Sequence, residues 1–155
     1  MPSLTRPIPA RALGALLFLA ALPALAGDYY EKNGAALAGH DPVAYFTEGK
    51  PLQGDAAITY VHKGSTFRFT TAANRDAFAA QPDRYAPQYG GYCAYGLTRG
   101  YKAKIDPAAF AVVDGKLYLN YNRQVQEMWS ADRKGFIATA DAKWPEVSQT
   151  TKVIE

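Results

Sequence analysis

The dipeptide Asp114-Gly115 is the feature of this sequence that most constrains its fold. It lies between two runs rich in β-forming residues, 110–113 (FAVV) and 116–121 (KLYLNY). Asp-Gly between such runs is the strongest short-range signal for a β-hairpin, because a tight turn needs the positive φ that glycine adopts. Lys63-Gly64 separates two further runs of strand-like alternation. The sequence therefore predicts two antiparallel hairpins.

Helix signals follow each hairpin. Thr70 or Thr71 can cap a helix over about 72–80, and Asn122 can cap another that runs to about Ser130. A last helix is expected over 136–143 and is expected to stop at Pro145. We find no long internal repeat and no second domain. We predict a small single α+β domain, with two hairpins in one antiparallel sheet, three to four short helices and a flexible tail at 148–155.

The first 26 residues have the pattern of a secretory signal peptide. Arg6 and Arg11 precede an almost wholly apolar run, and Ala24-Leu25-Ala26 is a small-x-small cleavage site before Gly27. An uncleaved anchor is the alternative. We predict cleavage near Ala26/Gly27, a periplasmic or secreted mature chain, and no membrane span after cleavage.

The charge of the mature chain excludes some classes of partner. The leader contains two of the 17 basic residues and none of the 14 acidic ones, so the mature chain is close to neutral. Nucleic-acid binding needs a concentrated basic face, and we therefore expect none.

The stretch Tyr85–Tyr101 (YAPQYGGYCAYGLTRGY) is the expected site. It contains five tyrosines, four glycines and Cys93, which is the only cysteine. A single cysteine excludes an intramolecular disulfide, although exported proteins usually pair their thiols. Cys93 is therefore a metal-binding or redox thiol, a link to another chain, or a buried small hydrophobe.

Several strings resemble the exported YHS-domain proteins of bacteria. The resemblance covers nearly all of the mature chain, and its strings are 40–46 (HDPVAYF), 67–78 (FRFTTAANRDAF), 82–94 (PDRYAPQYGGYCA), 113–121 (VDGKLYLNY) and 144–145 (WP). It implies that residues 27–147 form a YHS-like domain.

The resemblance also implies that an inherited metal site is absent. Metal-handling relatives are similar to D-P-V-C-G followed by F-C-S-x-x-C, and soft thiolates select copper and zinc. The corresponding positions here are Ala44, Thr70 and Asn74, none of which is a soft ligand. His40 is a departure too, because the exported branch often has tyrosine there.

Any remaining metal chemistry must involve Cys93. His40 is the expected second ligand, held in one tautomer by Asp41, and Met128 can offer a thioether to copper. Zinc is the other metal considered. The structural alternatives to metal binding are a partly exposed turn histidine at position 40 and a core methionine at position 128. His62, beside a hairpin turn, is expected to be solvated.

The tyrosines define a second candidate site. Tyr89, Tyr92 and Tyr95, with Asp41, can line a pocket for a small organic cation, although such clusters more often serve packing.

The sequence favours binding over catalysis. It has no glycine-rich phosphate loop and no HExxH, CxxC or GxSxG motif. The leading hypothesis is a periplasmic protein that binds a soft metal, most readily copper, through Cys93. Its rival is a non-catalytic structural or interaction module with a buried thiol and a periplasmic protein partner.

Overall fold

The computed structural model describes residues 28–155, so the predicted signal peptide lies outside the described residues. The elements are β1 (Glu31–Lys32), β2 (Ala35–Ala36), η1 (Leu37–Gly39), α1 (Ala44–Thr47), β3 (Asp55–His62), β4 (Ser65–Phe69), α2 (Ala72–Ala80), α3 (Pro82–Tyr85), η2 (Gln88–Gly91), α4 (Ala94–Thr98), β5 (Lys102–Ala103), β6 (Asp106–Val113), β7 (Lys116–Asn120), α5 (Arg123–Ser130), α6 (Arg133–Val147) and β8 (Val153–Ile154). The predicted α+β class is confirmed.

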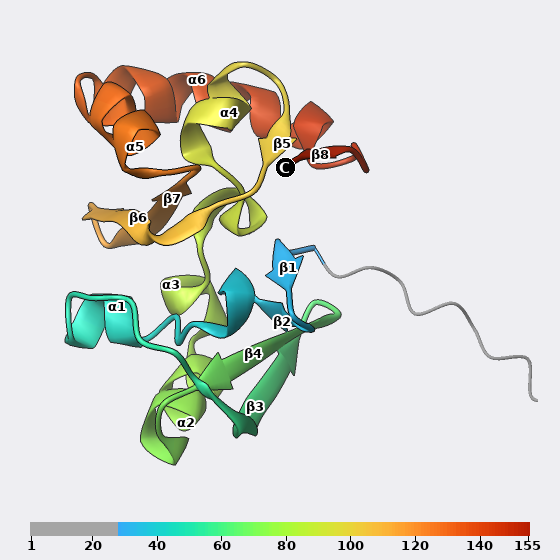
Figure 1. Cartoon of the computed structure of the whole chain (residues 1–155), viewed down its shortest axis with the longest axis vertical. Helices are drawn as coiled ribbons and strands as arrows, with labels where there is room; N and C mark the ends of the chain where they lie inside the picture. Colours follow the sequence, from blue (N-terminus) through green and yellow to red (C-terminus); the bar gives the residue numbers. More distant parts are fainter. Residues whose placement is uncertain (1–27) are drawn as a thin grey trace, which may run out of the picture.

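Both predicted hairpins are present, but they do not share a sheet. β3 pairs with β4 and β6 pairs with β7, each as a separate two-stranded antiparallel sheet. In Figure 1 the β3–β4 hairpin and α2 lie in the lower half of the molecule, whereas β6–β7 and α5 lie in the upper half. The expectation of one sheet was therefore wrong, since each hairpin packs its own helix.

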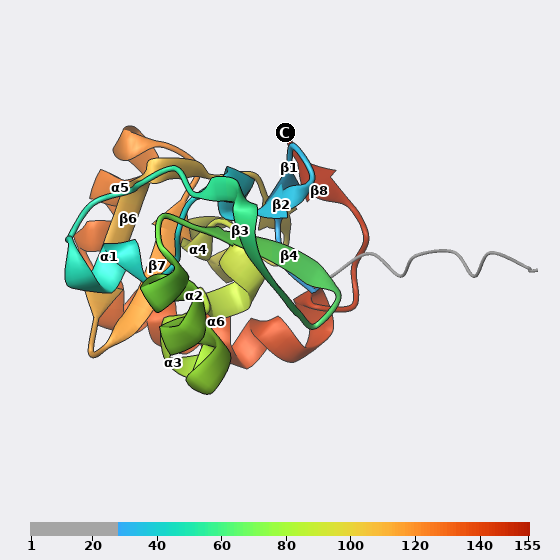
Figure 2. The same cartoon turned by 90° about the horizontal axis from the view of Figure 1, so that it is seen from below.

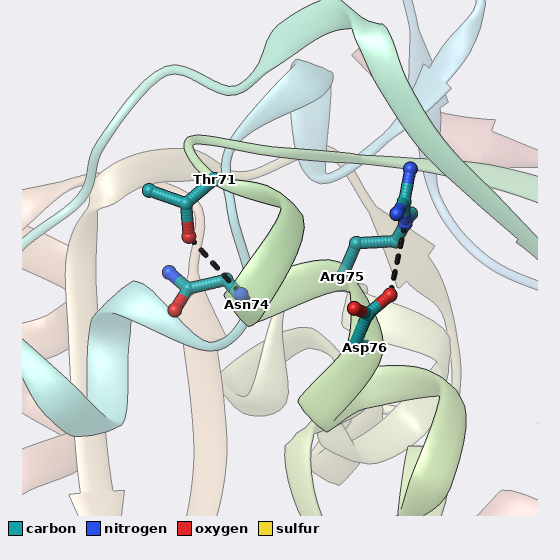
Figure 3. Close-up of polar contacts among 4 residues, drawn as sticks. All are labelled: Thr71, Asn74, Arg75 and Asp76. Atoms are coloured by element: carbon teal, nitrogen blue, oxygen red, sulfur yellow. Dashed lines mark hydrogen bonds and ion pairs between the residues drawn. The ribbon is translucent and has the colours of Figure 1, made fainter.

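The predicted caps hold the two helices that follow the hairpins. The Asn74 amide donates to Thr71 Oγ1 over 3.0 Å at the start of α2 (Figure 3). The Val125 amide donates to Asn122 Oδ1 over 2.8 Å at the start of α5. A side-chain acceptor at this position satisfies an amide that has no partner within the helix.

Helix α6 is longer than the sequence indicated. It begins at Arg133, after the cap Asp132, and continues through Pro145 to Val147. Pro145 has no N–H to donate, so this last turn lacks one backbone hydrogen bond, and the buried Val147 anchors it.

The carboxyl-terminal segment, expected to be a flexible tail, forms strand β8 in this structure. Residues 153–154 pair in parallel with β5. The Lys102 ammonium donates to the carbonyl oxygens of Ser148 (2.9 Å) and Thr150 (2.7 Å). These contacts hold the segment against β5, and in the view from below β8 lies on the side of the molecule opposite β6 and α5 (Figure 2).

One continuous core joins the two halves. Its largest fully buried side chains include Trp129, Tyr45, Phe67 and Phe78. Tyr45 of α1 connects the halves, since its hydroxyl donates to the Pro107 carbonyl over 2.9 Å. Among residues 28–155, no helix is long and apolar enough to cross a membrane.

Candidate functional site

Cys93 lies where the tyrosine- and glycine-rich stretch turns into α4. Residues 89–91 all have positive φ, which reverses the chain just before it. Gly90 is required there, because a side chain would collide with the Asp28 carbonyl oxygen. Cys93 then serves as the N-cap residue of α4.

The Cys93 thiol is buried and hydrogen-bonded. Its side chain is 2% exposed, and Sγ accepts the amides of Tyr121 (3.2 Å) and Gly96 (3.4 Å). The thiol proton points to Asn120 Oδ1, 3.7 Å from Sγ. Sulfur therefore fastens α4 to the end of β7.

Asn120 completes this arrangement from the last position of β7. It is fully buried, and its Oδ1 also accepts the Tyr95 amide over 3.1 Å. Its Nδ2 has no partner within the described part of the chain. Sequence reasoning placed Asn120 in the strand run 116–121 and gave it no part in the site, because its contact with Cys93 joins residues 27 positions apart.

Burial raises the pKa of the Cys93 thiol, and the amide hydrogen bonds from Gly96 and Tyr121 act in the opposite direction. A thiol with a raised pKa holds little thiolate at neutral pH, and the thiolate is both the nucleophile and the metal ligand. The environment of Cys93 thus disfavours the thiolate.

The His40 ring lies against the backbone of its own turn, and Met128 is exposed. His40 Nδ1 lies 3.1 Å from the Leu37 carbonyl oxygen, so the expected support from the Asp41 carboxylate was wrong. Met128 is 45% exposed on α5, and the alternative of a core methionine was therefore wrong too. Among residues 28–155, no group of three or more His, Cys, Asp or Glu side chains could hold a metal ion.

The Asp41 carboxylate is instead the centre of a hydrogen-bonded network. Its Oδ1 accepts the amides of Val43 (2.8 Å) and Ala44 (3.3 Å). Its Oδ2 accepts the amide and hydroxyl of Thr70 (2.8 and 2.9 Å) and the Asn74 side-chain amide (2.8 Å). Positions 44, 70 and 74 therefore do meet in space, around a fully buried carboxylate and without a soft ligand.

The expected tyrosine cage is divided among several contacts. The Tyr89 hydroxyl donates to Asp141 Oδ1 over 2.7 Å. The Lys102 ammonium lies 5.0 Å from the centre of the Tyr92 ring, and the Arg99 guanidinium lies 5.1 Å from that of Tyr95. Cations of the chain itself thus lie over two of the three rings.

A cleft of about 920 Å³ opens beside Tyr89 and Tyr92. Its lining residues are Asp28, Tyr29, Lys63, Asp83, Ala86, Pro87, Gln88, Tyr89, Gly90, Tyr92, Lys102, Trp144, Ser148, Gln149, Thr150 and Thr151. Tyr95 and Asp41 are not among them. Tyr89 and Tyr92 belong to the predicted pocket, but the sequence did not indicate the other walls, which come from Asp28 and Tyr29, the turn of the first hairpin and the end of α6.

His62 is not the solvated residue that its position beside a turn suggested. Its ring packs 5.8 Å from that of Phe78 and 6.1 Å from that of Tyr29, measured between centroids. Burial, followed by the nearby Lys63 ammonium, lowers the pKa of His62.

Comparison of the chain with protein-family models, with curated proteins and with solved structures finds no match.

Proposed function

We propose that this chain is an exported, YHS-like, non-catalytic binding module in which Cys93 belongs to the framework. The observation that carries the proposal is the state of the thiol, which is 2% exposed and accepts two backbone amides. A side chain used in this way stabilises a loop and is closed to substrates. Binding then takes place elsewhere on the module, in the periplasm or outside the cell.

The cleft is the binding surface in this proposal. Its volume of about 920 Å³ is large enough for a small organic molecule, and its walls combine aromatic rings with charges of both signs. Asp28, Asp83 and Lys63 form no ion pair with any residue in the described range 28–155. A small zwitterion, such as an amino acid or a betaine, can place its ammonium near the carboxylates and its carboxylate near Lys63.

Thermal-shift and calorimetric titration of the mature protein with amino acids and betaines tests the cleft. A ligand that binds only the folded state raises the apparent stability. We expect the Tm increase to be lost in Asp83→Asn and kept in Asp76→Asn, which removes a carboxylate from the exposed face of α2. No response to any member of the panel contradicts the ligand class.

Copper binding through Cys93 is the second candidate. It is favoured by the two amides that donate to Sγ, because such donors stabilise a thiolate. One thiolate is a weak site, so His40, Met128 or a second chain would have to approach it. Zinc is the alternative metal.

Native mass spectrometry of the mature protein with Cu(I) or Zn(II) distinguishes the two candidates. The framework role predicts equal metal uptake by the unaltered protein and by Cys93→Ala. A metal adduct that is stoichiometric in the unaltered protein and lost in Cys93→Ala would favour the copper candidate.

A further inference from the structure

Residues 37–80 and 89–131, called here the first and second units, pass through the same series of conformations. Each begins with a left-handed turn and a short helix, continues into a hairpin, and ends with a capped helix. The outer strands β3 and β6 have eight residues each, and the inner strands β4 and β7 have five. The units lie in opposite halves of the molecule (Figure 1).

The left-handed turns agree residue by residue. The φ values are 55°, 52° and 82° over residues 37–39, and 56°, 61° and 77° over residues 89–91. Three consecutive residues with positive φ are rare, because side chains disfavour that region. In both units the amide that follows the turn donates back to the carbonyl of the first turn residue, over 3.0 Å at His40 and 3.1 Å at Tyr92.

The hairpins agree in the same way. Each outer strand begins with an aspartate, Asp55 or Asp106, whose Oδ1 accepts the amide two residues further on over 2.8 or 2.9 Å. In both, the strand register shifts between that aspartate and the residue four positions later. The φ values of the two turn residues are 48° and 78° at 63–64, and they are 50° and 72° at 114–115.

The helices repeat both cap and core contact. Thr71 and Asn122 lie 51 positions apart and cap α2 and α5. Phe78 of α2 packs on Phe67 at 4.7 Å between ring centroids, and Trp129 of α5 packs on Tyr118 at 5.5 Å. These pairs also lie 51 positions apart, so hairpin, helix and core have the same register in both units.

Asp41 and Cys93 occupy the same place in their units, one residue after the amide that closes the left-handed turn. Asp41 Oδ2 accepts the Thr70 amide over 2.8 Å, and Cys93 Sγ accepts the amide of its counterpart Tyr121 over 3.2 Å. Each side chain also accepts a hydrogen bond from the backbone amide three residues later in the chain, over 3.3 Å at Asp41 and 3.4 Å at Cys93.

We infer that the chain is an internal duplication of one loop–hairpin–helix unit, and that Cys93 is the clamp of the second unit as Asp41 is of the first. A clamp is here the side chain that ties the loop to the end of the inner strand. The loop that Cys93 positions contributes Tyr89, Gly90 and Tyr92 to the cleft. Cys93 is therefore a positioning residue for that wall.

The two clamps differ because their surroundings differ. The side chains of Thr70 and Asn74 donate to Asp41, whereas their counterparts in the second unit are Tyr121 and Val125, whose side chains do not donate to Cys93. A buried carboxylate needs more donors than two amides, while a neutral thiol does not. The thiol thus fits the unit that has fewer donors.

A transplant of the first clamp into the second unit tests the equivalence. Four mature proteins are compared by thermal unfolding: the unaltered chain, Cys93→Asp, the pair Tyr121→Thr with Val125→Asn, and the triple variant. We expect the pair to lower Tm in the unaltered background and to raise it by about 5 °C in the Cys93→Asp background, because the added groups then donate to the carboxylate.

A pair that lowers Tm by the same amount in both backgrounds, or a triple variant that fails to fold, overturns the equivalence. Hydrogen exchange of the unaltered protein gives a second readout that needs no variant. The amides of Thr70 and Tyr121 should both exchange only through global unfolding. Exchange of either amide through local opening would contradict its clamp.

Discussion

The Asp41 and Cys93 clamps perform the same structural task with different chemistry. Asp41 receives five hydrogen bonds on two oxygens, at 2.8 to 3.3 Å. Cys93 Sγ accepts hydrogen bonds from two backbone amides, at 3.2 and 3.4 Å, and the thiol donates a hydrogen bond to Asn120. Hydrogen bonds to a charged acceptor are the stronger kind, so the first unit depends more on its clamp than the second.

The difference gives a structural reason for an unpaired thiol at position 93. Position 93 needs a side chain that accepts hydrogen bonds, and Cys93 is one. Burial of Cys93 keeps its thiol away from oxidants in the solvent. The first unit meets the same need with a carboxylate, because Thr70 and Asn74 supply the extra donors.

The largest effect should come from removal of the first clamp. Asp41→Ala leaves buried donors without an acceptor, and we expect a loss of about 4 kcal/mol in the free energy of unfolding. Urea unfolding followed by circular dichroism measures it. Asp76→Ala is the matched control, since it removes only the exposed ion pair with Arg75 shown in Figure 3 and should cost under about 0.5 kcal/mol. Equal effects would mean that Asp41 is not a clamp.

Removal of the second clamp should cost roughly half as much. Cys93→Ala leaves the amides of Gly96 and Tyr121 unpaired, for an expected loss of about 2 kcal/mol. Cys93→Ser keeps an acceptor and should lose less. Both are measured by the same urea titration, and a serine variant less stable than the alanine variant would show that acceptance by Sγ contributes nothing.

The helix caps should be equivalent in the two units. Thr71→Ala and Asn122→Ala each remove one side-chain acceptor, so each should cost about 1 kcal/mol in unfolding experiments. A cost confined to one of the caps would break the symmetry between the units.

The smallest effect concerns pH and belongs to the first unit alone. The pKa of His62 is lowered in the folded state from 6.5, so the unfolded chain takes up the proton more readily. Stability from neutral His62 is complete above that pH and is lost as the pH falls below it. His62→Val, which introduces the residue found at the counterpart position Val113, should reduce the drop in Tm between pH 7.5 and 5.5. An undiminished drop would assign the pH dependence to other groups.

Local signals predicted the separate elements well. Lys63-Gly64 and Asp114-Gly115 marked the hairpin turns, and Thr71 and Asn122 marked the helix starts, because each effect acts within a few residues. The continuation of α6 through Pro145 and the pairing of β8 depend on long-range contacts, which local patterns do not contain.

The candidate site was predicted only in part. The position of Cys93 in an ordered aromatic loop followed from its glycines and tyrosines, but its partner Asn120 did not. The repeat escaped notice because the units share backbone conformation and hydrogen-bonding roles more than residue types. Asp41 with Cys93, and Phe78 with Trp129, are alike in place and not in identity.

Thiol labelling of the folded mature protein tests the central claim most directly. A disulfide reagent is added in native buffer, and the labelling rate of Cys93 is followed as urea is increased. The clamp predicts that labelling is limited by unfolding and that the protection factor matches the global free energy of unfolding. Labelling in native buffer at the rate of an exposed thiol would contradict the clamp and would favour Cys93 as a reactive site.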